Sequence, residues 1–192
     1  HYPLRRQRQM CIRDSCGRAV DRMEIRIDSP DPFKQVGEIL TKGMNVMDGY
    51  YNNPEASNTV LSPDGWLHTG DLGVLDPDGY LYIKGRSKSL ILGPSGQNIY
   101  PEEIEDLLNA QPYIAESLVI EREGKLVALV YPDAEAMKQN KISREALLKI
   151  IHETRKQINQ QIPAYSQIAR IEIHDEEFEK TPKRSIKRFL YQ

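Results

Sequence analysis

The spacing of apolar residues changes once along this chain, and this change limits the possible folds more than any other feature. Apolar and charged residues alternate at 23–27 (Met-Glu-Ile-Arg-Ile), which is typical of a half-buried strand. Beyond Tyr100, the residues Ile104, Leu107 and Leu108 recur at helical spacing. We therefore predict an α+β fold: an antiparallel β-subdomain followed by a small α+β domain whose short central sheet is flanked by helices.

Turn signals divide the first half of the chain into strands. The run Pro-Asp-Gly occurs at 63–65 and again at 77–79. Pro and Asp favour a type I turn, and Gly supplies the left-handed position before the next strand. We expect two hairpins here, and strands at 23–27, 37–41, 81–83 and 90–92.

The second half mixes helices and strands. Pro101 with two following acids predicts a helix start, because proline suits the first turn and acids suit the positive end of the helix dipole. Ser143 is the expected N-cap of a longer helix that reaches Ile158. The pair Glu123-Gly124 predicts a hairpin. We expect strands at 117–120, 126–130 and 168–173.

Composition excludes several classes of partner. The formal net charge of -2 gives no general attraction to nucleic acid or to an anionic membrane. No apolar run approaches the roughly 20 residues needed to cross a bilayer. The only cysteines are Cys11 and Cys16, which have no nearby histidines to complete a zinc site. We expect a reducing cytoplasm, with peripheral contact at the inner membrane face as an open alternative.

The first sixteen residues are rich in arginine and show no amphipathic period. A basic arm for a phosphate or a membrane is one interpretation. A disordered or non-native leader is the other, and it is the one we adopt, so residues 1–16 are left out of the fold prediction.

Five segments follow one another in an order that carries more information than any one of them. Together they resemble the closing motifs of the adenylate-forming family, which includes acyl-CoA synthetases, luciferases and peptide-synthetase adenylation domains. The segments are Gly-Glu-Ile-Leu-Thr-Lys-Gly at 37–43, Gly-Tyr-Tyr-Asn-Asn-Pro-Glu-Ala at 49–56, Gly-Trp-Leu-His-Thr-Gly-Asp at 65–71, Gly-Tyr-Leu-Tyr-Ile-Lys-Gly-Arg-Ser-Lys at 79–88, and Asn-Ile-Tyr-Pro-Glu-Glu-Ile-Glu at 98–105.

The resemblance implies a domain organisation and a reaction. Residues 17–88 would be the terminal β-subdomain of a large N-terminal AMP-binding domain, ending in a hinge, and 89–192 a mobile C-terminal lid. The parent enzyme would convert a carboxylate, ATP and CoA into acyl-CoA, AMP and pyrophosphate. The segment at 98–105 looks most like the branch that acts on long-chain fatty acids.

The resemblance also assigns roles to four residues. Asp71, in a Thr-Gly-Asp turn, would accept hydrogen bonds from both ribose hydroxyls of the nucleotide. Arg86 would contact the same ribose or the nearby phosphate. Lys88 falls at the hinge, where a few exposed residues can absorb a domain rotation. Gly96 would let its loop pass close to the pantetheine arm of CoA, although a simple β-turn explains it equally well.

The last motif departs from the family pattern. Relatives carry a lysine for the α-phosphate, usually in Lys-Thr-Pro-x-x-Lys, but here Ser185 occupies that position. Lys183 and Lys187 lie two residues away on either side. In an extended segment both would point where residue 185 points, whereas in a helix neither would. We favour Lys187 as the catalytic cation, because Lys183 lies close to Pro182 and its backbone has less freedom.

Several expected parts of an active site are absent from this sequence. It contains no Ser/Thr/Gly-rich phosphate loop, no Gly-Tyr-Gly-x-Thr-Glu segment for adenine, and no acyl pocket. ATP or AMP and CoA are the expected cofactors, and the ligands of Mg²⁺ should lie outside this chain. The chain alone should be inactive without the N-terminal domain of the same protein. Two rivals remain: an enzyme that transfers the acyl group to a carrier protein, and a non-catalytic binding module.

Overall fold

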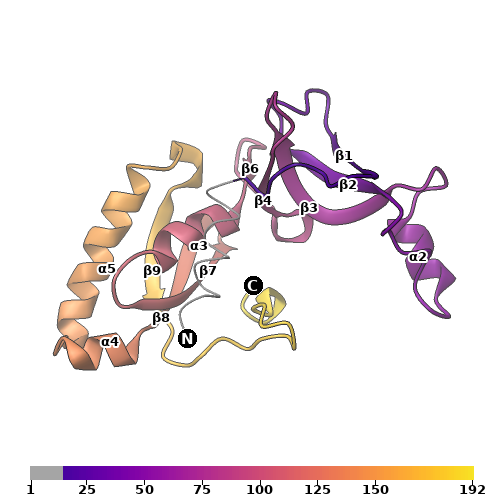
Figure 1. Ribbon diagram of the computed structural model, residues 1–192. Coiled ribbons are helices and arrows are strands. Elements are labelled where there is room, and N and C mark those ends of the chain that lie inside the picture. Colours follow the sequence, from indigo (N-terminus) through magenta and orange to yellow (C-terminus); the bar gives the residue numbers. More distant parts are fainter. Residues whose placement is uncertain (1–14) are drawn as a thin grey trace. The chain divides into compact units, whose positions relative to one another are not determined.

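The computed structural model describes residues 15–192, so most of the proposed leader lies outside the described residues (Figure 1). The chain divides into two compact units between Lys88 and Ser89. Each unit has its own sheet and its own apolar core. The predicted α+β class is confirmed by strands in both units and helices concentrated in the second.

The first unit is built on a four-stranded antiparallel sheet with the strand order β1-β2-β3-β4. Its core is small and contains Ile27, Ile39 and Leu81. One short helix, α2, joins β2 to β3 (Figure 1). The bounds of these elements are β1 Met23–Asp28, β2 Gly37–Gly43, α2 Pro54–Val60, β3 Leu67–Leu75 and β4 Leu81–Arg86.

Both predicted turns exist, but only the one at 77–79 joins two strands, β3 and β4. The turn at 63–65 lies between α2 and β3 and closes only an isolated bridge from Leu61 to Leu67, so the hairpin predicted there is wrong. Gly65 and Gly79 have φ of 88° and 82°, the left-handed conformation predicted for both Pro-Asp-Gly runs. Helix α2, in contrast, has no strong periodic signal. It begins because the Asn53 side chain accepts a hydrogen bond from the Ala56 amide and Pro54 occupies the first turn.

The second unit combines a two-stranded sheet, β5-β6, with a three-stranded sheet of order β7-β8-β9. Strands β7 and β8 form the predicted hairpin, while β8 and β9 are parallel and are joined through α4 and α5. The bounds are β5 Ile91–Leu92, β6 Asn98–Ile99, α3 Pro101–Asn109, β7 Ile114–Arg122, β8 Lys125–Pro132, α4 Ala134–Gln139, α5 Arg144–Asn159 and β9 Ile168–Ile173, with short 3-10 turns η2 Ala164–Ser166 and η3 Arg188–Leu190. A further 3-10 turn, η1 Ser87–Ser89, spans the boundary between the two units.

The three-stranded sheet is covered differently on its two faces. Val119 and Ala128 pack with helices α3 and α5, whereas Leu118 and Val127 pack with Phe178 of the C-terminal segment. This division follows from the strand period of two, which sends alternate side chains to opposite faces. Helices therefore cover one face, and the C-terminal segment 174–192, which we call the tail, covers the other (Figure 1).

Three sequence expectations can be compared directly with these elements. Ser143 caps α5 as predicted, its Oγ accepting from the Ala146 amide at 3.2 Å. The expected strands at 81–83 and 90–92 both exist, but β4 pairs with β3 and β5 pairs with β6. Cys16, which we assigned to the leader, donates its backbone N–H to Leu81 O at 2.7 Å.

Candidate active site

Asp71 and Arg86 lie directly opposite each other on strands β3 and β4. The Arg86 Nε lies 2.9 Å from Asp71 Oδ1, so the carboxylate and the guanidinium form an ion pair. The Asp71 side chain is partly buried and that of Arg86 is more exposed. The register of two antiparallel strands thus brings together two residues that the sequence analysis assigned to one nucleotide.

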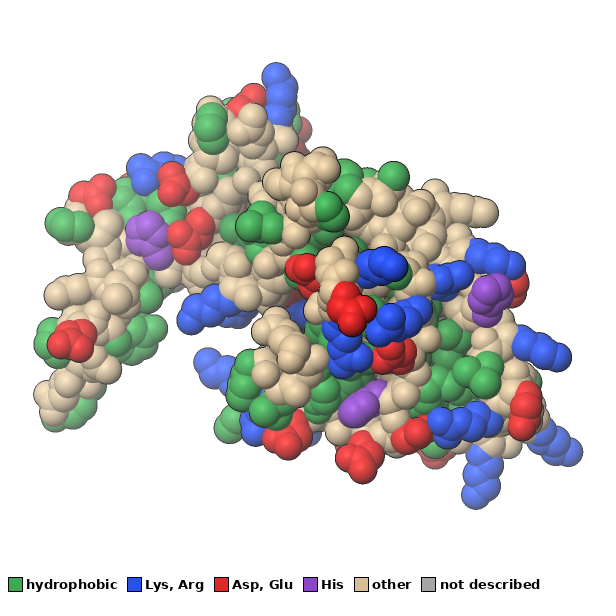
Figure 2. Space-filling view, turned by 180° about the vertical axis from the view of Figure 1, so that it is seen from behind, with side chains coloured by type: hydrophobic (Ala, Val, Ile, Leu, Met, Phe, Trp, Pro, Cys, Tyr) green, Lys and Arg blue, Asp and Glu red, His purple; other side chains and the backbone are tan. Residues whose placement is uncertain are grey.

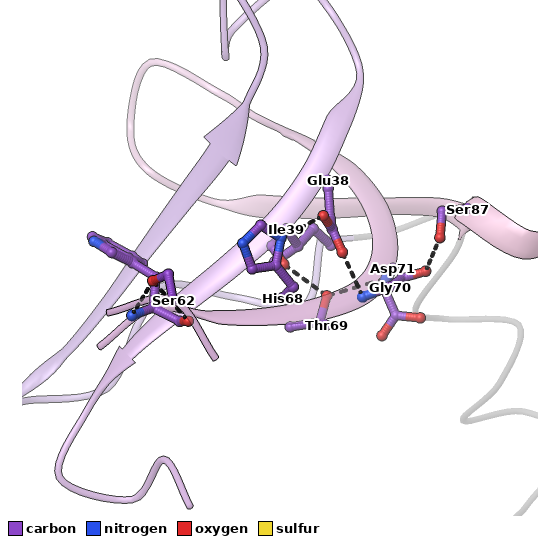
Figure 3. Close-up of polar contacts among 9 residues, drawn as sticks. Glu38, Ile39, Ser62, His68, Thr69, Gly70, Asp71 and Ser87 are labelled. Atoms are coloured by element: carbon purple, nitrogen blue, oxygen red, sulfur yellow. Dashed lines mark hydrogen bonds and ion pairs between the residues drawn. The ribbon is translucent and has the colours of Figure 1, made fainter. Parts of the chain in front are cut away.

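The bend that carries Asp71 is fixed by side chains from neighbouring strands (Figure 3). Glu38 of β2 accepts one hydrogen bond from the Gly70 amide at 2.9 Å and contacts His68 Nδ1 at 2.8 Å. Ser87 Oγ donates to the Gly70 carbonyl at 3.2 Å. Gly70 has φ of 72°, a conformation that glycine adopts easily and that strains most other residues. Its amide and its carbonyl are therefore both hydrogen-bonded at a bend in the backbone.

Thr69 adds a second connection between β2 and β3. Its Oγ1 donates to the Ile39 carbonyl at 2.7 Å and accepts from the Asp71 amide at 3.1 Å. The register shifts next to these contacts, between Glu38 and Leu40. Such an irregularity re-aims side chains at the end of a ladder. Thr69, Gly70 and Asp71 therefore form an irregular bend within strand β3, and not the separate turn that the sequence predicted.

The surroundings of Asp71 shift the pKa of its carboxyl in opposite directions. Burial raises the pKa of its carboxyl above the ordinary value, the positive charge of Arg86 lowers it, and the negative charge of Glu38 raises it. The Asp71 carboxylate therefore lies beside the Arg86 cation and near the Glu38 carboxylate of β2. Such an acceptor suits neutral hydroxyl donors such as those of a ribose.

The loop between β5 and β6 contains Gly96, whose φ is 77°. The Gly96 amide donates to the Gly93 carbonyl at 2.9 Å, which closes a tight turn. A Cβ atom at this position would meet no other atom within 4 Å, so the space beside the backbone here is open. Beside this loop lies a cavity of about 240 Å³, whose lining includes Gly93, Pro94, Lys125 and Tyr165.

Lys88 lies in the 3-10 turn η1, whose residues include no buried side chain. The division of the chain into two units falls immediately after it. Its place between β4 and β5 is therefore an exposed link between two separately folded units.

The segment around Ser185 is neither extended nor helical, so neither alternative of the sequence analysis applies. Lys180 and Ile186 form an isolated antiparallel bridge. The Thr181 amide donates to Ser185 O at 2.8 Å and the Arg184 amide donates to Thr181 O at 2.8 Å. Pro182 favours such a type I turn at its second position, and Arg184 follows with φ of 61°. We call residues 181–185 the tail turn.

The cations near the tail turn differ in their partners. Lys187 Nζ pairs with Glu179 Oε2 at 3.0 Å. Lys180 Nζ pairs with Glu116 at 2.8 Å and also with Glu177. The exposed Lys183 and Arg184 side chains form no ion pair among residues 15–192. The turn thus projects two uncompensated positive charges, one of which, Arg184, the sequence analysis did not consider.

Sequence reasoning missed the residues that support the site. Glu38 lies in the first quoted motif and Glu105 in the last, but neither residue type by itself reveals a distant partner. The His68 ring contacts Glu38 through its Nδ1 atom. Among the described residues, no group of three or more His, Cys, Asp and Glu side chains could hold a metal ion.

Two observations concern the charges on the surface and the apolar length of the helices. On the face that Figure 2 shows, Lys and Arg side chains are interspersed with Asp and Glu side chains. No helix within the described part of the chain is long and apolar enough to cross a membrane.

The second unit, a small α+β domain that follows a β-rich unit, can be compared with known families. Residues 88–191 match the model of the family described as AMP-binding enzyme C-terminal domain, and the chain belongs to that family.

Curated relatives and solved structures agree with this assignment. The chain is 45% identical to the indoleacetate–CoA ligase of Aromatoleum aromaticum over 124 residues, which is 60% of this chain and 24% of that protein. It is 38% identical to the 2-succinylbenzoate–CoA ligase of Bacillus anthracis over 143 residues, 72% of this chain and 29% of that protein. Its fold matches the AMP complex of the O-succinylbenzoate coenzyme A synthetase of Bacillus subtilis with a TM-score of 0.72 and 29% identity, covering 93% of this chain and 35% of that one. The chain therefore spans about a quarter to a third of these relatives.

Proposed function

We propose that this chain is the C-terminal part of an ATP-dependent acyl-CoA ligase. In the first half-reaction a carboxylate attacks the α-phosphorus of ATP, forming acyl-AMP and releasing pyrophosphate. In the second, the thiol of CoA attacks the acyl carbon, forming acyl-CoA and releasing AMP. The observation that carries the proposal is the Asp71–Arg86 pair at a bend fixed by Glu38 and Ser87.

Asp71 is proposed to hold the nucleotide in both half-reactions. Its carboxylate has acceptor capacity for hydroxyl donors, and Arg86 keeps it oriented from the adjacent strand. ATP supplies the activated phosphorus, and Mg²⁺, held by residues outside this chain, would offset the phosphate charge. The role of this chain's own residues is to bind and orient the ribose.

We propose Lys183 as the cation that faces the α-phosphate in place of the family's lysine. Its ammonium has no carboxylate partner among the described residues, whereas the ammonium of Lys187 is paired with Glu179. A paired lysine must give up its partner before it can serve a phosphate. We therefore propose Lys183 in place of Lys187, which the sequence alone favoured.

Gly96 and its loop are proposed to line the path of the pantetheine arm once the C-terminal unit has turned about Lys88. The open space above Gly96 and the adjacent cavity support this assignment. The identity of the carboxylic acid substrate is the part of the proposal that this chain restricts least. The names of the relatives, indoleacetate and 2-succinylbenzoate ligases, favour aromatic acids beside the long-chain fatty acids that the segment at 98–105 suggested.

Product analysis of the full-length protein tests the proposal. Aromatic, short-chain and long-chain acids are each incubated with ATP, Mg²⁺ and either CoA or a phosphopantetheinylated carrier protein. We expect AMP release and an acyl-CoA thioester with at least one acid. A thioester on the carrier protein alone would transfer the function to the carrier-loading class. If none of the acids gives AMP release, a non-catalytic module is favoured.

The variant Asp71→Ala sharpens this experiment. A charged hydrogen bond of this kind is worth about 1.5–3 kcal/mol, so both half-reactions should slow by roughly 10- to 150-fold. The matched control is Asp31→Ala, which removes an exposed carboxylate paired with Lys34 in the same unit and should leave both rates unchanged. Damage confined to one half-reaction would contradict the ribose role.

A further inference from the structure

On the outer edge of the three-stranded sheet, Val119 contacts two charged side chains. Among the described strands, β7 is at the edge of this sheet. At Val119 the amide donates to Glu105 Oε1 at 2.6 Å, and the carbonyl accepts from Arg188 Nη1 at 3.3 Å. Both backbone groups of Val119 are thus satisfied by charged side chains from elsewhere in the chain.

The same two side chains are bonded to each other. Arg188 Nη2 lies 2.5 Å from Glu105 Oε2 and 3.4 Å from Glu102 Oε1. Glu105 belongs to α3 and Arg188 to the tail, so the pair joins a helix, an edge strand and the tail. Glu105 is buried, and burial raises its pKa to about 7 although Arg188 and the Val119 amide act in the opposite direction. Breaking one partner of such a pair leaves a buried charge uncompensated.

The tail turn is tied down on both sides. On its entry side, Lys180 pairs with Glu116 of β7 at 2.8 Å. On its exit side, Arg188 reaches Glu105 and Val119. Between these two anchors the turn at 181–185 is short and closed by its own hydrogen bonds. A short turn between two fixed points cannot move far without breaking one of them.

We propose that Glu105 and Arg188 are positioning residues that hold the tail turn, and with it Lys183, for the adenylation step. They act through the turn and need not touch substrate. This inference rests on the proposed function for its catalytic half, while its structural half concerns this chain alone. Misplacing a reacting group by about 1 Å can cost on the order of 100-fold in rate.

The structural half is tested by amide hydrogen exchange and proton chemical shifts of the 192-residue chain. In Arg188→Ala, the amides of Thr181, Arg184 and Ser185 should exchange at least about tenfold faster, because the exit anchor is lost. In Glu105→Gln, compared with wild type at a pH well above 7 so that Glu105 is ionised, the Val119 amide proton should move upfield, because its acceptor is no longer charged. The control Lys156→Ala removes an exposed pair with Glu153 within α5, away from the tail, and should change neither signal. Wild-type exchange in the turn of folded Arg188→Ala would overturn the inference.

Arg188→Lys guards against a variant that fails to fold. Lysine keeps a positive charge beside Glu105 but lacks the planar fork that serves Glu105 and Val119 together, so a partial loosening of the turn is expected. If folded Arg188→Lys and Arg188→Ala both keep wild-type exchange in the turn, the anchor is wrong.

The catalytic half is tested in the full-length protein. Arg188→Lys and Arg188→Ala should slow acyl-AMP formation by about 10- to 100-fold. Thioester formation from supplied acyl-AMP should change much less. Equal loss in both half-reactions would overturn the positioning role and leave only a structural one. If the wild-type protein itself forms no acyl-AMP, the proposed function fails, and the exchange result still decides whether Arg188 and Glu105 hold the turn.

Discussion

The pKa of the Asp71 carboxyl depends on two neighbouring charges in the proposed nucleotide site, Arg86 and Glu38. Arg86→Ala removes the cation and should raise this pKa further, whereas Glu38→Gln removes a negative charge and should lower it. Carboxyl ¹³C NMR of the chain would measure both. Because the folded pKa lies above 3.8, this carboxyl stabilises the fold most below pH 3.8, and the contribution is lost as the pH rises through the folded pKa. An unchanged pKa in both variants would mean that neither charge acts on Asp71.

Lys183 and Lys187 differ in a way that mutation can separate. If Lys183 faces the α-phosphate, Lys183→Ala in the full-length protein should slow acyl-AMP formation by about 10²–10³-fold, as is common when one donor to a developing charge is removed. Lys187→Ala should have a small effect, because this lysine is paired with Glu179 on the surface of the tail. The reverse result would transfer the role to Lys187. Normal adenylation by both variants and the double variant would show that neither lysine is catalytic.

At the scale of elements, Phe178 is the most deeply buried aromatic ring by which the tail packs on the sheet. Phe178 is 2% exposed and packs with Leu118 and Val127, whereas Phe189 on the same tail is 71% exposed. Phe178→Ala should lower the free energy of unfolding by about 3–5 kcal/mol, measured by urea denaturation. The matched change Phe189→Ala should lower it by less than about 0.5 kcal/mol. Similar losses from both would mean that the tail does not pack as described.

The elements that sequence could predict are those with local signals. Glycines at the turns and the Ser143 cap act within a few residues, and they were found correctly. Helix α2 was missed because it is short and buries no side chain, so it leaves no apolar period. The anchor between Glu105 and Arg188 joins residues 83 positions apart, and no local pattern reports such a contact.

For the site, the sequence named Asp71 and Arg86 through motif resemblance, and strand register brings them together. It did not identify Glu38 or Ser87 as supports of the bend, because those contacts depend on how three strands align. It also assumed a regular backbone around Ser185. The tight turn after Pro182 places Lys183 and Lys187 in different surroundings, which spacing alone does not show.

At the scale of the whole molecule, we propose that Lys88 is the hinge. Proline at this position would fix φ near -65° and restrict rotation of the unit that follows. In the full-length protein, Lys88→Pro should preserve adenylation if the restricted state is the adenylating one, and should greatly slow acyl-CoA formation from supplied acyl-AMP. Half-reaction assays, with circular dichroism as the check on folding, would measure this. Equal loss in both half-reactions of a folded variant would remove the hinge assignment.

We propose that this chain completes an enzyme that forms an acyl-adenylate before it reacts with a thiol. Isotope exchange between labelled pyrophosphate and ATP in the full-length protein tests this claim most directly. We predict exchange that requires a carboxylic acid and Mg²⁺ but not CoA, and that falls roughly 10- to 150-fold in Asp71→Ala. Folded full-length protein that shows no exchange with any acid of the panel, or exchange that does not depend on the acid, would contradict the claim.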